Sequence, residues 1–324
     1  MPARLSTEEL RPPGAPGTAE RVRPARRRGA RVYAERLSLE PRDAGGILDL
    51  ALDGLVARCG PSLGLVLLVW LPFGQIRAIL ESAGLDDFAA GITALSVNFL
   101  TLVPQAFSLG VVTSLVGDAL AGGQSGVGRS ILRGLWAGPA VTVMLLATQV
   151  LTLPLILCFF LPYVLVQWLT WAAVPLYVLE GEELLTLRER ILARRNPLVA
   201  LAMVPRRIAR AFARSVRLST GWASLGRWTV LAVVGLLLLS GSLEISATLL
   251  SAPEVREFLR TDLGLGGRLA EFAMATVSGF FLALASSVRA ALMTAFYLDL
   301  RVRREGLDLE LSLRELPAGA EATS

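Results

Sequence analysis

The residues with the clearest capacity for chemistry follow the last long apolar stretch of the chain. Acidic and basic side chains alternate in this segment, which contains Tyr297, Asp299, Arg301, Arg303, Glu305, Gly306 and Asp308. Alternating charges exceed what anchoring a membrane helix requires, and they can form ion pairs with other segments. Glu180 closes the fourth apolar stretch at the same expected depth. We therefore expect Arg301 or Arg303 to pair with Glu180; the alternative is a solvated tail.

Two further ionisable residues interrupt apolar stretches. Glu244 lies toward the end of the fifth stretch and Arg289 lies well along the sixth. An ionisable group at bilayer depth is costly and marks a functional site by default. The spacing predicts that the two lie too far apart in depth to pair. For Arg289, two alternatives stay open: its side chain extends toward the cytoplasmic headgroups, or it lines a polar cavity within the bundle.

Composition excludes much other chemistry. All 32 basic residues are arginines, and the chain has no histidine. An imidazole base, a Schiff-base lysine and a phosphate-loop lysine are therefore excluded. The two cysteines, Cys59 and Cys158, are expected on opposite sides of the membrane and provide no cluster of metal ligands. We expect no catalytic residue, no metal and no cofactor, and the chain is not expected to be an enzyme.

Six apolar stretches must position these residues. Hydrophobic residues make up 53% of the 324 residues, and only 18% are charged. A helix of about 20 mostly apolar residues crosses a bilayer. Such stretches lie near residues 59–78, 88–117, 136–159, 162–180, 228–250 and 272–298. The sequence predicts an all-α, polytopic transmembrane bundle over residues 41–312, between a disordered Arg/Pro/Ala-rich tail at 1–40 and a disordered tail at 313–324.

The arginines predict the orientation of these spans. The two chain ends and the loops at 118–135 and 180–227 together hold 27 of the 32 arginines. Cytoplasmic segments of membrane proteins are enriched in basic residues. Both ends and these two loops are therefore expected on the cytoplasmic side of an inner membrane. The net charge of +5 then needs no nucleic acid to explain it.

Two cytoplasmic segments have the pattern of amphipathic interfacial helices. The apolar stripe of the first consists of Ile47, Leu48, Ala51, Leu52, Leu55 and Val56, and Asp49 and Asp53 face away from it. In the second, the apolar face is Ile208, Phe212 and Val216, and the opposite face is Arg207, Arg210, Arg214 and Arg217. A basic amphipathic helix fits the headgroup layer of a bilayer, so these arginines are candidates for binding anionic lipids. The alternative is that the helix packs on its neighbours and the arginines are merely solvated.

The sixth span also carries a pattern of small residues. Ala275, Gly279, Ala283, Ser287, Ala291 and Ala295 recur at every fourth position. Small side chains let helices approach closely in lipid, where no hydrophobic driving force acts between them. We expect this ladder to be a packing seam.

The segment Thr294–Leu309 resembles the carboxyl signature of a family of uncharacterised bacterial six-helix membrane proteins, often labelled glycerophosphoryl diester phosphodiesterase membrane domain. Pro41–Asp49 is similar to the first helix of that family, and Val178–Gly181 with Arg214–Leu218 resembles its central loop. The stretch from Glu182 to Arg210 is longer than the usual connection. The resemblance implies a membrane location and a six-helix fold. It implies no reaction, because catalysis in phosphodiesterases with this region resides in a separate soluble domain.

These patterns favour a non-catalytic, multi-pass integral membrane protein that serves as an accessory or scaffold component through cytoplasmic contacts. The alternative is a transporter or channel for a small solute or lipid, in which Arg289 and Glu244 would line the path. A water-filled cavity around Arg289 would favour transport. A solid bundle with a charged cytoplasmic underside would favour a scaffold.

Overall fold

The structure is a computed structural model that describes residues 42–81, 87–120, 126–158, 160–261 and 267–305. Both predicted tails, together with Gly306 and Asp308, lie outside the described residues. The helices, in chain order, are α2 (Ala44–Ala57), α3 (Cys59–Glu81), α4 (Asp87–Leu120), α5 (Val127–Cys158), α6 (Phe160–Thr170), α7 (Ala173–Glu180), α8 (Leu187–Arg195), α9 (Pro197–Ala202), α10 (Val204–Ser219), α11 (Trp222–Ser251), α12 (Pro253–Thr261) and α13 (Gly267–Glu305). No strand occurs in this part of the chain, so the all-α prediction is confirmed.

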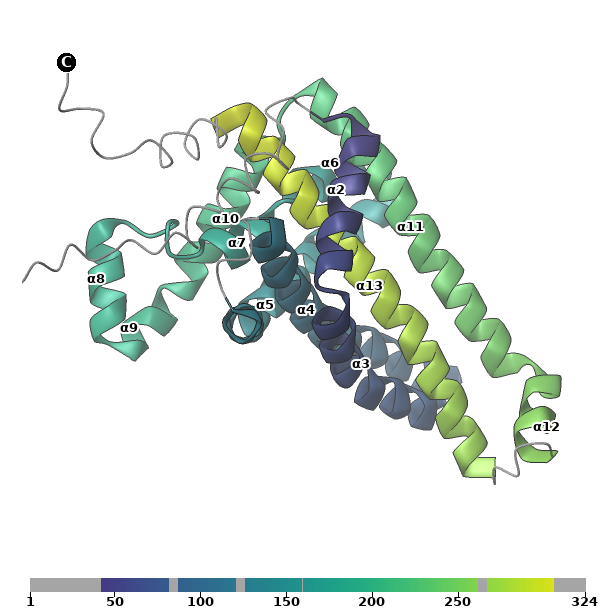
Figure 1. Cartoon of the computed structure of the whole chain (residues 1–324). Helices are drawn as coiled ribbons and strands as arrows, with labels where there is room; N and C mark the ends of the chain where they lie inside the picture. The colour runs from purple at the N-terminus through teal and green to yellow at the C-terminus, as the bar shows by residue number, and fades with distance from the viewer. Residues whose placement is uncertain (1–41, 82–86, 121–125, 159, 262–266, 306–324) are drawn as a thin grey trace, which may run out of the picture.

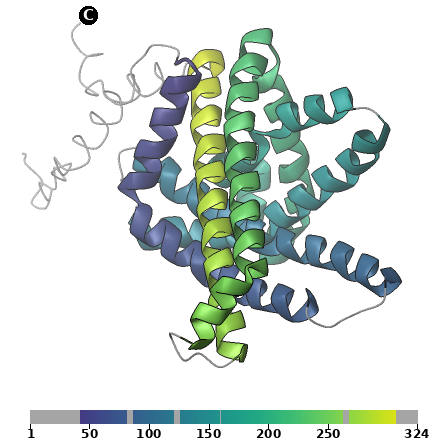
Figure 2. The same cartoon turned by 90° about the vertical axis from the view of Figure 1, so that its right-hand side faces the viewer.

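Within the described part of the chain, six stretches are long and apolar enough to cross a membrane. They are Cys59–Ile76, Thr101–Leu120, Val127–Thr152, Leu161–Glu180, Trp222–Ser242 and Phe272–Glu305. The six-span prediction is therefore confirmed, and the chain is a multi-pass membrane protein. Figures 1 and 2 show α11 and α13 running side by side along the bundle, with α12 at one end. We call the opposite end, where α13 finishes at Glu305, the polar end.

The long helix α13 forms the centre of the packing. Residues 290–300 are all buried, and α2, α3, α4, α7 and α11 all contact α13. The small-residue ladder lies in this buried face, as expected. Gly279 is nevertheless not tightly packed, because a Cβ atom added there would lie 3.8 Å from the nearest heavy atom, in Leu71.

The closest approach of helix backbones occurs instead between α4 and α5. A Cβ atom added to Gly134 would lie 2.5 Å from the Cα atom of Val111, and one added to Gly110 would lie 2.6 Å from the carbonyl oxygen of Gly134. Real side chains do not tolerate such distances to backbone atoms, so both positions require glycine. These glycines set the spacing of α4 and α5.

The fourth span is divided into two helices. α6 ends at Thr170 and α7 begins at Ala173, with Trp171 and Ala172 in the turn between them. Pro175 lacks the amide hydrogen that would bond to the carbonyl of Trp171, and its ring crowds that carbonyl, which explains the break. The hydroxyl of Ser215 in α10 donates to the carbonyl oxygen of Leu169 at 2.7 Å and satisfies backbone at the end of α6.

The two expected interfacial helices both pack on the bundle. In α2, Ile47, Ala51 and Leu55 are buried as predicted, but the prediction was wrong for Leu52 and Val56, which are exposed because only the side of α2 that faces the bundle is covered. In α10 the buried face is Ile208, Ala211, Ser215 and Leu218, and it lies on α6 and α7. The buried face of α10 is therefore rotated relative to the predicted face of Ile208, Phe212 and Val216, since Val216 is 37% exposed. For α10 the alternative of packing on neighbouring helices describes the structure.

Candidate functional site

A closed ring of four charged side chains lies at the polar end. Glu180, the last residue of α7, is 5% exposed and pairs with Arg301 of α13 at 2.5 Å and with Arg214 of α10 at 2.6 Å. Arg214 also pairs with Glu305 at 2.5 Å, and Arg301 pairs with Glu305 at 3.1 Å. The hydroxyl of the fully buried Tyr297 donates to Glu180. The ring joins α7, α10 and α13, and it contains the expected pair between Glu180 and Arg301.

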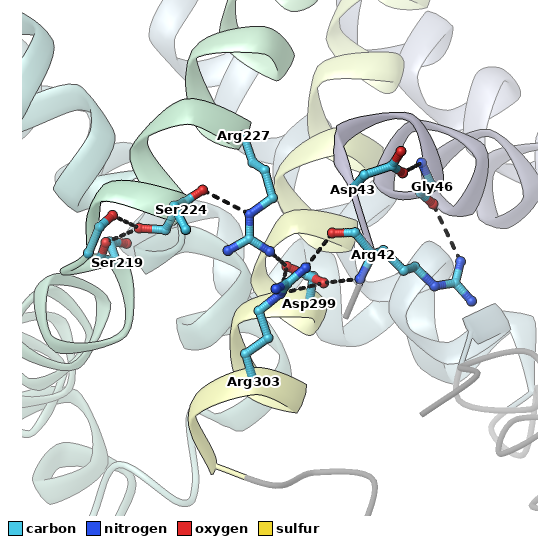
Figure 3. Close-up of polar contacts among 10 residues, drawn as sticks. Arg42, Asp43, Gly46, Ser219, Ser224, Arg227, Asp299 and Arg303 are labelled. Carbon is cyan, nitrogen blue, oxygen red and sulfur yellow. Dashed lines mark hydrogen bonds and ion pairs between the residues drawn. The ribbon is translucent and has the colours of Figure 1, made fainter. Parts of the chain in front are cut away.

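A second cluster surrounds Asp299, whose side chain is almost fully buried (Figure 3). Arg227 of α11 pairs with this carboxylate at 2.6 Å, and Arg303 pairs with it at 2.9 Å from the next turn of α13. The backbone amide of Arg42 donates to Asp299 at 3.3 Å, and Arg303 donates to the carbonyl oxygen of Arg42. Arg303 thus binds Asp299 and the chain before α2. Of the two arginines expected to pair with Glu180, Arg301 does so, whereas the expectation for Arg303 was wrong because it pairs with Asp299.

The electrostatics of both clusters favour a structural tie. Charges removed from water are costly unless each is paired and hydrogen-bonded. Here the carboxylates of Glu180, Glu305 and Asp299 each bind two arginines, so none is available as an uncompensated base. Burial opposes the charged form of Arg214, but its hydrogen bond to Glu305 and the nearby carboxylates raise its pKa overall. The arrangement holds helices together.

A further ion pair attaches α8 to α10. Thr186 and Glu189 form a capping box at the start of α8, and the Glu189 carboxylate accepts bonds from Arg210 at 2.6 and 3.1 Å. The hydrogen bonds from Arg210 hold the pKa of Glu189 at about 2. Arg210 also donates to the carbonyl oxygen of Leu184 at 2.8 Å. Two members of the expected lipid-facing arginine stripe, Arg210 and Arg214, are therefore engaged within the chain.

The other two arginines of that stripe lie differently. Arg217 is exposed, whereas Arg207 is partly buried beside Tyr177 and lines a cavity of about 550 Å³ between α5, α7, α8 and α10. Arg133 and Arg190 line the same cavity. Sequence periodicity could not separate these roles, because an arginine facing lipid and one facing a carboxylate follow the same helical spacing.

The two intramembrane candidates lie in different surroundings. Glu244 lies exposed near the end of α11, beyond the apolar stretch Trp222–Ser242. The guanidinium of Arg289 lies 5.7 Å from the ring centroid of Trp171, in a cation–π contact at the break between α6 and α7. A cavity of about 30 Å³ adjoins Arg289, with Gln167 and Thr170 in its lining.

The remaining expectations concern metal ligands, the two cysteines and the family resemblance. Among the described residues, no group of three or more metal-ligating side chains could hold a metal ion. Cys59 is a free, exposed thiol, while the side chain of Cys158 lies outside the described part. The chain matches no protein-family model, no curated protein and no solved structure. The family resemblance therefore stays a prediction.

Sequence reasoning did not assign Arg227 or Arg214 to the network. Arg227 directly precedes the fifth apolar stretch, which is the position that also suits an orientation signal. The resemblance included Arg214 in its central-loop motif, and that is the one signal in the sequence that points to a role for it beside Glu180. The position of Asp299, one helical turn before Arg303, similarly suits the contact that the structure has.

Proposed function

We propose that this multi-pass membrane protein is a non-catalytic accessory or scaffold component that presents a rigid polar surface to a protein partner. The closed ring of Glu180, Arg214, Arg301 and Glu305 carries the proposal, because it fixes three helices at one end of the bundle. The Asp299 cluster extends the same surface to α2 and α11. Side chains fixed by several charge-assisted bonds are preorganised and lose little entropy on binding.

We place the polar end in the cytoplasm of an inner-membrane protein, with both chain ends on that side. The support is the concentration of arginines in segments that belong to this end. Cysteines introduced singly at Arg188 in α8 and at Glu257 in α12 test the orientation in a background without Cys59 and Cys158. Both positions are exposed. An impermeant thiol reagent applied to intact cells should label only the cysteine at 257; labelling only at 188 would reverse the orientation.

A transporter is the second candidate, and one observation favours it. Arg289 of α13 lies beside the break between α6 and α7. Interrupted helices near intramembrane charges form substrate sites in many transporters. The adjoining cavity of about 30 Å³ has room for only about one or two waters, which supports the scaffold instead. Met293 lines this cavity. A cysteine there should resist thiol reagents from both sides, whereas a transporter would expose it during its cycle.

Crosslinking in membranes tests the scaffold directly. A photoreactive residue replacing the exposed Arg217 at the polar end should give a discrete protein adduct. The same residue at Glu257, at the opposite end, should not. Breaking the ring with Arg301→Gln should weaken the adduct without removing the protein from the membrane. Equal adducts at both ends, or adducts at Arg217 that ignore Arg301→Gln, would contradict the proposal.

A further inference from the structure

One cavity at the polar end carries three arginines from three helices. Arg133 belongs to α5, Arg190 to α8 and Arg207 to α10, and all three line the volume of about 550 Å³. A smaller cavity of about 160 Å³ adjoins it and shares Arg190 and Arg207. Guanidinium groups that converge from separate elements are the usual means by which proteins bind phosphate.

Carboxylates also line the cavity, but they leave an unmet hydrogen-bond donor. The Glu180 carboxylate is occupied by Arg214, Arg301 and Tyr297. Glu182 and Glu183 lie at the exposed rim. The Nε group of Arg207 is buried and meets no acceptor among the described residues. A buried donor without a partner is unfavourable, and the guanidinium to which this donor belongs lines the cavity that an acceptor would enter.

The mouth of the cavity continues into an apolar surface. Trp136 of α5 lines the cavity and is 78% exposed. Val143 and Val150 follow it at seven-residue intervals, so the three side chains lie along one face of α5, and both valines are also more than half exposed. Tryptophan is enriched where the headgroup layer meets the hydrocarbon of a bilayer. A molecule with its phosphate among the arginines could thus lay an acyl chain along this face.

We propose that this cavity is a binding site for the phosphate of a phospholipid headgroup, with Arg133, Arg190 and Arg207 as its ligands. Arg207 presents its half-buried guanidinium from α10, and Arg133 stands nearer the opening, where its side chain is 40% exposed and also pairs with Asp118 at 3.4 Å. We propose this defined site in place of the expected contact between lipid headgroups and all four arginines of α10, because Arg210 and Arg214 form ion pairs within the chain. It requires only that the protein is embedded in a membrane, so it can fail without affecting the scaffold proposal.

Native mass spectrometry of the full-length protein in detergent tests the site. The probes are phosphatidylglycerol, diacylglycerol with the same acyl chains but no phosphate, and inorganic phosphate. Arg207→Gln removes the donor, Arg207→Lys keeps the charge but removes the fork, and Arg217→Gln is the matched control on the same helix. Circular dichroism and melting temperature report whether each variant is folded. Arg133→Gln, at the exposed mouth, provides a variant that leaves the interior contacts in place.

We expect the protein to retain phosphatidylglycerol and to lose diacylglycerol. Arg207→Gln and Arg133→Gln should each weaken retention about tenfold or more, and Arg207→Lys should weaken it less, because phosphate contacts with a fixed fork are worth more than those with a point charge. If inorganic phosphate competes with the lipid, the phosphate contact is supported and free phosphate becomes a second source of the ligand. Equal retention of diacylglycerol, or equal loss in Arg217→Gln and Arg133→Gln, would overturn the proposal.

Discussion

The two ends of the bundle are held together in different ways. At the polar end, residues 290–300 of α13 are buried and the neighbouring helices are joined through ionised side chains. At the other end, the first part of the same helix exposes Leu269, Phe272 and Phe280. Among the described helices, α12 packs on α13 and makes at most marginal contact with any other. Lipid can solvate exposed leucine and phenylalanine but not an unpaired carboxylate. The bundle thus has a fixed end that depends on complete pairing and a looser end that depends on the bilayer.

The largest difference between the ends should come from removing a carboxylate. Glu180→Ala leaves Arg214 and Arg301 partly buried with one partner fewer, and breaking such a pair typically costs about 3–5 kcal/mol. Glu244→Ala, at the looser end, removes an exposed carboxylate and should change the unfolding free energy by less than about 0.5 kcal/mol. Chemical denaturation in a mild detergent measures both. Similar losses would erase the distinction between the ends.

The next largest difference should come from glycines. Gly134→Ala places a methyl group against the backbone of α4 and should destabilise the bundle by about 1–3 kcal/mol through overpacking. Gly235→Ala in α11 meets nothing within 4 Å and should be neutral or stabilising, because alanine is the better helix former. The midpoint of thermal unfolding in detergent compares the two. A tolerated Gly134→Ala would show that α4 and α5 can separate at little cost.

A smaller, more specific effect concerns the coupling within the ring. Glu180→Gln, Arg301→Gln and the double variant form a cycle that isolates the energy of that pair. We expect a coupling above the 0–1 kcal/mol or so of exposed ion pairs, because both side chains are largely buried. The cycle with Arg303→Gln should be close to additive, since Arg303 contacts Asp299 instead. Additive losses in both cycles would remove the ring as the origin of the rigidity.

The smallest expected effect lies in α8, at the edge of the fixed end. The pKa of Glu189 is lowered from 4.5 to about 2 by Arg210, so the ionised form stabilises the folded state above pH 4.5. This contribution should fade as the pH falls from about 4.5 to 2, because the unfolded carboxylate takes up its proton first. The protection of α8 amides against hydrogen exchange, taken relative to the intrinsic exchange rate at each pH, should fall over that range in the native protein. Glu189→Gln should exchange faster already at pH 6 and show a flatter profile.

Much of the architecture could be read from the sequence because the bilayer imposes a length on every span. Glu180 and Arg301 could be paired in advance because both close apolar stretches at the same depth. The role of Arg214 could not, since its spacing fits a lipid-facing stripe equally well. The break before Ala173 depends on Pro175, and prolines in other spans, such as Pro104 in α4, leave their helices continuous. The close contact at Gly134 depends on which helices become neighbours, and that is decided only by the complete fold.

The ring has a consequence for how the chain is made. Glu180 and Arg214 are synthesised well before Arg301 and Glu305, which belong to the last described helix. Until that helix enters the membrane, Glu180 and Arg214 have only each other, and Arg227 has no Asp299 to bind. Segments of a chain fold in the order of their synthesis where they can. Closure of the ring therefore requires the insertion of α13, and a chain truncated before α13 would lack the partners of Glu180, Arg214 and Arg227.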